Sequence, residues 1–233
     1  MGIILIKNNK GGVGKSWLSL QLAGYQAYKN KKVLILTSDS QNNILNFAGI
    51  KADTSKKGLE DLLEGKAYNL TTLRPNLMFL HLQGYKLKRD YEEKLKTAIK
   101  KWEREFDYIV IDGSPVLGLD NVFIEIAEHI IVPTFLDRVT TNAILQMLKT
   151  VDISKIRAVI PNRVGRTKLE KEEYNLLDER LKKMSKLLTM PISQSGNITK
   201  LIDKGSLVWD SKSTKLDFIK GVFEEVWREI ENE

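Results

Sequence analysis

Residues 7–17 read KNNKGGVGKSW, and this stretch decides the fold class of the 233-residue chain. Its Gly-Lys-Ser, residues 14–16, matches the end of the phosphate-binding loop G-x-x-x-x-G-K-[ST]. The first glycine of that pattern would stand at position 9, where the chain has Asn9, and an additional lysine, Lys10, follows directly. The stretch therefore predicts a phosphate cradle with one lysine more than the general pattern requires.

The position of this loop favours phosphate binding over a chance glycine-rich turn. The loop follows a short apolar run and opens a predicted helix. Glycines let backbone N–H groups approach phosphate oxygens without an intervening Cβ, and a helix N-terminus adds partial positive charge. Lys15 can reach the β- and γ-phosphates, and the Ser16 hydroxyl can ligate Mg²⁺. We therefore expect a nucleotide with Mg²⁺ as the ligand.

Short apolar runs alternate with longer amphipathic stretches along the chain. Nearly continuous apolarity is typical of strands that are covered on both faces. The pattern predicts a doubly wound α/β fold of the P-loop NTPase type, with a mostly parallel sheet and helices on both faces. No repeat, linker or low-complexity tract interrupts it, so we expect a single domain over residues 1–233. The predicted strands cover residues 3–6, 33–36, 77–82, 108–111, 130–132 and 156–160. The predicted helices cover residues 15–30, 88–105, 141–151, 168–188 and 215–230.

Composition narrows the classes of function. The chain has no cysteine, which excludes disulfides, thiolate metal sites and cysteine-ligated iron–sulfur clusters. The lack of cysteine also suits a cytoplasmic protein, and no segment is apolar over the 18 or so residues that a membrane span needs. The formal net charge of +7 is compatible with nucleic acid or an anionic membrane as a partner.

Two carboxylates are predicted to lie beside the phosphate loop. Asp112 comes directly after a buried strand, which is the Walker B arrangement for a Mg²⁺ site. Asp39 and Gln41 follow a second strand, and a carboxylate there can orient an attacking water or hold a metal-bound water. The alternative for Asp39 is an N-cap of a helix that starts near Asn43.

Taken together, these motifs resemble the ParA/MinD (Soj-type) family of deviant Walker A ATPases. Residues 10–16 match the family's loop K-G-G-x-G-K-[ST] at every fixed position, and residues 39–41 resemble its switch I. Residues 111–115 resemble its Walker B and switch II, and the later runs IIVPT and AVIPNR occur in the expected order. The resemblance covers most of residues 1–165.

The resemblance implies an ATPase that forms a homodimer around ATP and Mg²⁺. Lys10 would cross the dimer interface to the phosphates of the partner's nucleotide, which explains the extra lysine. The implied catalytic residues are Lys10, Lys15 and Asp39. The implied nucleotide contacts are Lys10, Gly11, Gly12, Val13, Gly14, Lys15, Ser16, Trp17, Asn162 and Arg163. The implied residues at Mg²⁺ are Ser16, Asp39 and Asp112. For Asn162, expected at the adenine edge, the alternative is a turn residue beside a proline.

The chain departs from the family pattern at four positions. Trp17 stands where the family has a second hydroxyl that commonly helps to bind the α-phosphate, so a hydrogen-bond donor is lost and a bulky ring is gained. Thr37 replaces a usual aspartate, and Ser40 and Ser114 each replace a usual proline. These departures concern the rate of hydrolysis and the behaviour of the switches rather than the ATPase assignment.

The family includes membrane-bound selectors of the division site and DNA-partition proteins, and the C-terminal segment indicates which of these the chain resembles. Membrane-bound selectors of the division site end in a basic amphipathic helix, whereas residues 213–233 hold three Lys or Arg against six Asp or Glu. An anionic membrane would repel that face, so we expect the apolar stripe to pack in the core, and we expect no membrane partner. The stripe consists of Phe218, Ile219, Val222, Phe223, Val226, Trp227 and Ile230.

The remaining branch is DNA partition. The chain enters its first strand at Ile3 and so resembles the short form without a helix-turn-helix domain. That form binds double-stranded DNA nonspecifically as an ATP dimer, associates with the nucleoid, and works with a ParB-like centromere-binding adaptor. A MinD-like membrane-cycling ATPase and an ATP-dependent ligase or kinase of the same fold remain the alternatives. The expected DNA contacts are Arg163, Arg166, Lys168, Lys200 and Lys204.

Overall fold

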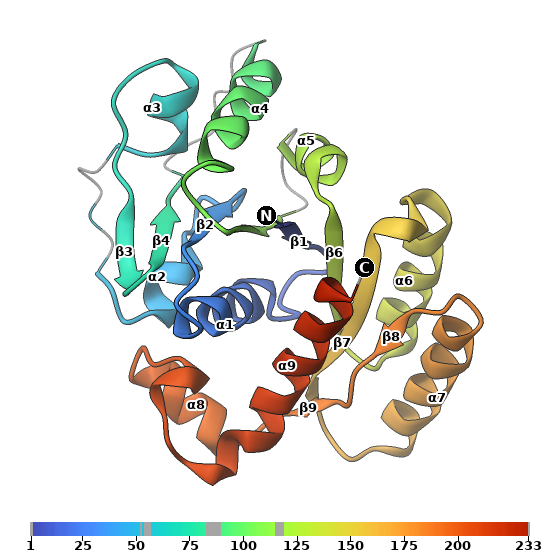
Figure 1. The fold of residues 1–233 in the computed structure, drawn as a ribbon. Helices are drawn as coiled ribbons and strands as arrows, with labels where there is room; N and C mark the ends of the chain where they lie inside the picture. Colours follow the sequence, from blue (N-terminus) through green and yellow to red (C-terminus); the bar gives the residue numbers. More distant parts are fainter. Residues whose placement is uncertain (1, 52, 54–56, 83–89, 115–118, 233) are drawn as a thin grey trace.

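The computed structural model describes residues 2–51, 53, 57–82, 90–114 and 119–232 (Figure 1). Two expectations lie outside these residues: Pro115 of the predicted switch II, and the first two positions of the helix predicted from residue 88. The strands form one sheet in the order β3-β4-β2-β5-β1-β6-β7-β8, and β9 pairs with β7. The strands are β1 (Gly2–Ile6), β2 (Val33–Thr37), β3 (Thr71–Arg74), β4 (Leu77–Leu80), β5 (Tyr108–Asp112), β6 (His129–Thr134), β7 (Ile156–Val164), β8 (Leu187–Leu188) and β9 (Ile192–Ser193).

All six predicted strands are present, and every pair among the described strands is parallel except β3 with β4. The sequence prediction missed β3 because it is short and polar, at the edge of the sheet. Its hairpin partner follows directly, with Asn76 in the left-handed region at φ 61°. It also missed β8, because the helix predicted to residue 188 ends at Lys182 and the chain continues into this strand.

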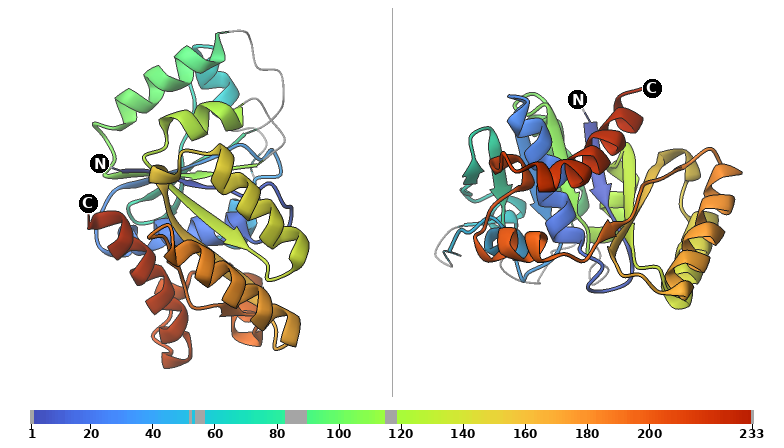
Figure 2. Two further views of the ribbon diagram at one scale, coloured as in Figure 1. Left: turned by 90° about the vertical axis from the view of Figure 1, so that its right-hand side faces the viewer. Right: turned by 90° about the horizontal axis from the view of Figure 1, so that it is seen from below.

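The helices divide between the two faces of the sheet. In β1 the side chains of Ile4 and Ile6 face one apolar cluster, and those of Ile3 and Leu5 face the other. The first cluster includes α1 and α9, and the second includes α4 and α5; the left view of Figure 2 shows these pairs on opposite sides of the sheet. The doubly wound prediction is thus confirmed. The helices are α1 (Lys15–Tyr28), α2 (Asn43–Phe47), α3 (Leu59–Leu63), α4 (Tyr91–Trp102), α5 (Leu119–Ile126), α6 (Arg138–Thr150), α7 (Lys168–Lys182), α8 (Gly196–Asp203) and α9 (Asp217–Glu231), with single 3₁₀ turns at Ile153–Lys155, Val208–Asp210 and Thr214–Leu216.

The apolar stripe of α9 packs in the core, as predicted, at six of its seven positions. Trp227 is 1% exposed and donates from Nε1 to the carbonyl oxygen of Leu22 in α1, at 3.0 Å. Phe218 is the exception and is 53% exposed. Among the residues that the structure describes, no helix has the length and apolarity that crossing a bilayer requires. The face that a membrane-surface helix would present is therefore already buried in the protein.

Candidate functional site

The loop between β1 and α1 has the backbone that a phosphate cradle needs. Gly12 and Gly14 have φ angles of +77° and +93°, in the left-handed region that favours glycine. A Cβ on Gly14 would overlap the side-chain amide of Asn162. That amide donates from Nδ2 to the carbonyl oxygen of Val13 at 2.9 Å, and both residues are buried. Asn162, at the end of β7, therefore braces the loop from the neighbouring strand end.

A first cavity of about 290 Å³ opens in front of this loop. It brings the loop together with Asp39 and Asp112, the two carboxylates that the sequence placed beside it. Their strands β2 and β5 are neighbours in the parallel sheet, so both carboxyl ends meet at one edge. The residues lining the cavity are Gly11, Gly12, Gly14, Lys15, Ser16, Asp39, Asn43, Phe47, Asp112, Gly113, Ser114 and Arg163.

Asp112 is the most strongly perturbed carboxyl of the cavity. Burial is the main cause that raises its pKa to about 7, and the nearby Asp39 carboxylate adds to the increase. Hydrogen bonds from Ser16 and Thr37 and the charge of Lys15 act in the opposite direction. Its Oδ2 is buried and has no hydrogen-bond partner among the described residues.

The unpartnered oxygen of Asp112 fits a bound cation. A buried anionic oxygen is costly unless something compensates it, and Mg²⁺ is commonly held by one or two carboxylates together with substrate phosphates. The described residues contain no group of three or more His, Cys, Asp or Glu side chains that could hold a metal. The Asp112 carboxylate together with substrate phosphates would form such a donor set.

Lys15 contributes a positive charge to the lining of the first cavity. Its Nζ donates to the carbonyl oxygen of Lys10 at 3.1 Å. Burial lowers the pKa of Lys15, and Lys7 lowers it further, whereas Asp112, Asp39 and Asp120 oppose the decrease. This ammonium is half desolvated and held beside the glycines, which suits it to an anionic ligand.

Asp39 does not cap the helix that follows it, so the N-cap alternative is wrong. The N-cap of α2 is Asn42, in the left-handed region at φ 47°. Asp39 instead accepts from the backbone N–H of Gln41 with Oδ1, at 3.0 Å, and from the Asn43 side-chain amide with Oδ2, at 3.4 Å. The carboxylate is thereby held in the lining of the first cavity.

Two of the residues that depart from the family pattern, Thr37 and Ser114, take part in hydrogen bonds beside the first cavity. The backbone N–H of Asp39 donates to Thr37 Oγ1 at 2.9 Å. The backbone N–H of Ser114 donates to the Ser38 hydroxyl at 2.6 Å. Thr37 therefore orients Asp39, and Ser38 joins the end of β2 to the segment that follows Asp112.

A second cavity of about 220 Å³ adjoins the first and shares Gly14, Phe47 and Arg163 with it. Trp17 lines this second cavity and not the first. Its ring is 4% exposed and packs against Phe223 of α9, with ring centroids 6.0 Å apart. Its indole Nε1 is buried and has no hydrogen-bond partner among the described residues. The other lining residues are Asn162, Ser193, Gln194, Ser195, Ile198, Thr199 and Ile202.

Asn162 and Arg163 lie within β7, so the turn alternative for Asn162 is wrong. The Asn162 side chain lines the second cavity while its amide braces the loop, and a contact with a base there stays a prediction. Arg163 has a φ of +55° and an exposed side chain. For a residue other than glycine this backbone is uncommon and is often found at functional sites.

Lys10 is exposed and lines neither cavity. Its backbone N–H donates to Asn8 Oδ1 at 2.8 Å, which fixes the path of the chain into the loop. Asn8 is itself buried and donates to the carbonyl oxygen of Pro133 at 2.6 Å. The side chain of Lys10 is thus presented at the surface beside the cradle, and its contact with a second chain stays a prediction.

The predicted DNA contacts come from different parts of the fold, and Arg163 lines both cavities. Lys200 lies in α8 and Lys204 forms the C-cap of that helix, and both are exposed. Arg166 and Lys168 line a different groove of about 580 Å³ between β7 and α7, together with apolar residues such as Met190. The contact of any of these residues with DNA stays a prediction.

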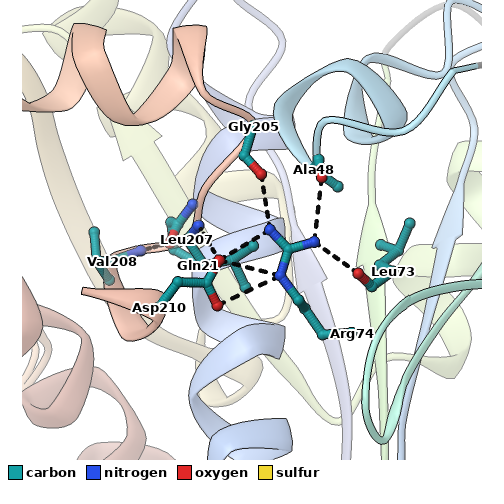
Figure 3. Close-up of polar contacts among 8 residues, drawn as sticks. All are labelled: Gln21, Ala48, Leu73, Arg74, Gly205, Leu207, Val208 and Asp210. Carbon is teal, nitrogen blue, oxygen red and sulfur yellow. Dashed lines mark hydrogen bonds and ion pairs between the residues drawn. The ribbon is translucent and has the colours of Figure 1, made fainter. Parts of the chain in front are cut away.

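The helix that carries Lys200 and Lys204 is fastened to the site through Arg74 (Figure 3). The Arg74 guanidinium donates to the carbonyl oxygens of Ala48, at 3.2 Å, and of Gly205, at 2.7 Å, and pairs with the Asp210 carboxylate. A Cβ on Gly205 would collide with the backbone of Gly49. The end of α8 is thus held directly against the end of α2, and α2 contributes Asn43 and Phe47 to the cavities.

Sequence reasoning missed several residues of the site. Asn43 and Phe47 were not predicted, although a helix directly after the Asp39 segment pointed to residues beside the phosphate loop. Gln194 and its neighbours come from a segment 180 residues from the loop with no motif of their own. The ion pair between Lys7 and Asp120 was also missed, because nothing in the sequence relates positions 113 residues apart.

Residues 1–162 match a family model, AAA_31, described as an AAA domain. Among curated proteins, the chain is 30% identical over 162 residues to the sporulation initiation inhibitor protein Soj of Bacillus subtilis. The aligned region covers 64% of this chain and 64% of that protein. The chain is 27% identical over 168 residues to the chromosome partitioning protein ParA of Myxococcus xanthus, covering 66% and 59%. The matched region thus spans less than two thirds of these relatives' length.

Solved structures show the same fold over nearly the whole chain. Apo McdA from Cyanothece superposes with a TM-score of 0.81 at 20% identity, covering 97% of this chain and 99% of that one. A plasmid partition protein from Borrelia burgdorferi bound to AMPPNP gives 0.78 at 20% identity and covers 98% of both chains. The MinD cell division protein of Aquifex aeolicus gives 0.76 at 18% identity, covering 100% and 98%.

Proposed function

Since the chain belongs to the AAA_31 family and is similar to Soj and to the chromosome partitioning protein ParA, we propose that it is an ATPase that binds Mg²⁺-ATP in its two adjoining cavities. The observation that carries this proposal is the first cavity. It sets the half-desolvated Lys15 and the unpartnered oxygen of Asp112 around the glycine loop. The phosphates occupy the first cavity, and the nucleoside occupies the second.

The residues of the first cavity have different roles toward the phosphates, the metal ion and the attacking water. The N–H groups of the loop and of the first turn of α1 donate to phosphate oxygens, and Lys15 leaves the Lys10 carbonyl to pair with the terminal phosphates. Ser16 and Asp112 would hold Mg²⁺, with Asp39 beside them. When bound, Mg²⁺ offsets phosphate charge and lowers the barrier to phosphoryl transfer. Asp39 orients the attacking water. Its own position is fixed by hydrogen bonds with Thr37, Gln41 and Asn43.

Two proposals follow for assembly and cargo. Lys10, exposed beside the cradle, reaches the phosphates of a second chain, so that ATP joins a homodimer and hydrolysis releases it. The dimer binds double-stranded DNA nonspecifically through α8, associates with the nucleoid in the cytoplasm, and moves plasmid or chromosomal cargo with a ParB-like adaptor. The fixed contact between α2 and α8 supports this reading, because it joins the nucleotide cavities to the helix that carries Lys200 and ends at Lys204.

The proposal predicts a fluorescence signal from Trp17. Because Trp17 lines the proposed nucleoside cavity with an unpartnered Nε1, ATP should change the tryptophan emission, and Trp17→Phe should remove most of that change. The matched control is Trp102→Phe, which removes a buried tryptophan of the opposite cluster and should leave the ATP-dependent change intact. A full ATP-dependent change in Trp17→Phe would show that the nucleoside binds elsewhere.

The DNA proposal predicts a loss of affinity that is independent of sequence. Lysine contacts to phosphates release counterions, so log K falls by about 0.9 per neutralised phosphate for each tenfold rise in salt. Lys200→Ala with Lys204→Ala should weaken binding of the ATP form to any duplex and flatten the salt slope by roughly one unit per lost contact. ATP hydrolysis without DNA should persist, because neither lysine lines a cavity.

The control for this experiment is Lys182→Ala with Lys183→Ala. It removes the same charge from the far end of α7, where both lysines pair with acidic residues of their own helix, and it should leave DNA binding unchanged. Equal losses in the two double variants would mean that only net charge matters. An unchanged affinity and slope after loss of Lys200 and Lys204 would assign the contacts to Arg163, Arg166 and Lys168.

One experiment separates the proposal from its alternatives. The protein is sedimented with duplex DNA and with anionic phospholipid vesicles, each with ADP and with a slowly hydrolysed ATP analogue. ATP-dependent binding to DNA supports partition. ATP-dependent binding to vesicles alone would instead make the chain a MinD-like membrane-cycling ATPase. ATP hydrolysis with neither partner would favour a small-molecule enzyme such as a ligase or kinase.

A further inference from the structure

A buried ion pair lies directly behind the phosphate loop. Lys7, the first residue after β1, pairs through Nζ with the Asp120 carboxylate at the start of α5. The side chains are only 7% and 14% exposed. Most ion pairs between described residues of this chain are far more exposed, for example Lys96 with Glu125, at 36% and 63%. This pair is therefore set apart by its burial.

The surroundings of the pair join it to the nucleotide site. The backbone N–H of Lys7 donates to the carbonyl oxygen of Ile131 at 3.0 Å, and that of Gly113 donates to the carbonyl oxygen of Ile6 at 3.0 Å. A Cβ on Gly113 would lie 3.7 Å from Asp120 Oδ1. Asp120 thus lies against the backbone that directly follows Asp112, while Lys7 lies three residues before Lys10.

Both charges act on the lysine of the cradle, in opposite directions. Lys7 disfavours and Asp120 favours the charged form of Lys15. In a partly buried setting the effective dielectric constant is far below that of water, so a unit charge near the cavity affects an anionic ligand strongly. While the pair is closed, the two opposite charges lie together and oppose each other at the cradle. An unpaired Lys7 would attract phosphates, and an unpaired Asp120 would repel them.

We propose that the Lys7–Asp120 pair is a charge-compensating element of the nucleotide site, which sets the affinity for phosphates by keeping a buried lysine neutralised behind the loop. The proposal rests on the nucleotide binding proposed above. Lys7 and Asp120 touch no ligand in it and act through the field at Lys15 and the cradle. The pair would thereby limit how tightly ATP is held, which matters for a protein that must release ADP after each turnover.

The test compares two single variants that carry opposite charge changes. Lys7→Gln leaves the Asp120 carboxylate, and Asp120→Asn leaves the Lys7 ammonium, and each keeps a hydrogen-bonding side chain for the remaining partner. Calorimetry should show that ATP binds roughly tenfold more weakly to Lys7→Gln and roughly tenfold more tightly to Asp120→Asn. The double variant Lys7→Gln/Asp120→Asn is neutral and should return close to the affinity of the unmodified protein.

The number of phosphates separates a charge effect from a structural one. The difference between the two single variants should be largest for ATP, smaller for ADP and absent for adenosine, because adenosine carries no charge. Lys96→Gln removes the α4 lysine of the exposed pair that Glu125 forms on the same helix α5 as Asp120; it serves as the control and should bind all three ligands normally. Thermal unfolding without nucleotide confirms that each variant is folded.

The outcomes distinguish the inference from the function on which it rests. If the unmodified protein binds no nucleotide, the proposed function fails. If it binds ATP but both single variants weaken binding alike, or if adenosine is affected as much as ATP, the charge-compensating role is overturned and the pair is structural. Opposite shifts that grow with phosphate number, and that cancel in the double variant, support the inference.

Discussion

Asp39→Ala should bind ATP but hydrolyse it on the order of 10²–10⁴ times more slowly than the unmodified protein, because the loss of one positioned catalytic group costs that much in rate. Asp39 lines the first cavity with a carboxylate that accepts from the Gln41 N–H and the Asn43 amide, and its backbone N–H donates to Thr37 Oγ1. Without hydrolysis the ATP dimer should persist. Steady-state release of phosphate measures the rate, and light scattering with ATP measures the lifetime of the dimer.

Asp39→Asn is the control that separates the effect of the carboxylate charge from the effect of the hydrogen bond that Asp39 accepts from Gln41. An asparagine oxygen can still accept from the N–H of Gln41, so the local backbone is kept while the negative charge is lost. A catalytic role requires Asp39→Asn to be nearly as slow as Asp39→Ala. Near-normal turnover in Asp39→Asn would show that the residue only shapes the segment before α2, and the catalytic assignment would be withdrawn.

Lys10→Ala should still bind one nucleotide per monomer but should fail to dimerise with a slowly hydrolysed ATP analogue. A hydrogen bond to a charged group is worth about 1.5–3 kcal/mol, and a symmetric dimer contains two such contacts. The loss of about 3–6 kcal/mol corresponds to an increase in the dimer dissociation constant of roughly 10²–10⁴. Light scattering across a range of protein concentrations measures this change.

The matched control is Lys29→Ala, which removes an exposed lysine from the opposite end of α1 and should dimerise normally. Nucleotide binding by Lys10→Ala should be close to normal, because the Lys10 side chain lines neither cavity, and the contact of Lys15 with this residue uses the backbone carbonyl. A normal ATP dimer in Lys10→Ala would mean that Lys10 acts within its own chain, and the account of the extra lysine would be wrong.

These two variants test separate steps. Asp39 concerns the chemistry within one cavity, whereas Lys10 concerns the joining of two chains. An Asp39→Ala protein that dimerises and a Lys10→Ala protein that does not would together establish ATP as the link between chains. Asp39→Ala with Lys10→Ala should then bind ATP, remain monomeric and hydrolyse it no faster than Asp39→Ala alone.

The amino-acid sequence by itself determined the fold class and the elements around the phosphate loop. The six predicted strands are all present, because buried parallel strands must be apolar throughout and so stand out along the chain. The Gly-Lys-Ser of the loop and the carboxylates Asp39 and Asp112 were identified because they follow strands, and parallel strands end at the same edge of a sheet. The stripe of α9 was identified from its helical spacing.

Only the tertiary structure decided which distant residues complete the site. The bracing of Val13 by Asn162, the burial of Trp17 against Phe223, and the neutralisation of Lys7 by Asp120 all join positions more than 100 residues apart. The placement of Arg166 and Lys168 in a groove beside α7 was equally hidden. Local periodicity reports which face of an element is apolar, but the packing of the whole chain determines which side chains from different elements meet. That is why the sequence predicted the cradle, and only the fold revealed what surrounds it.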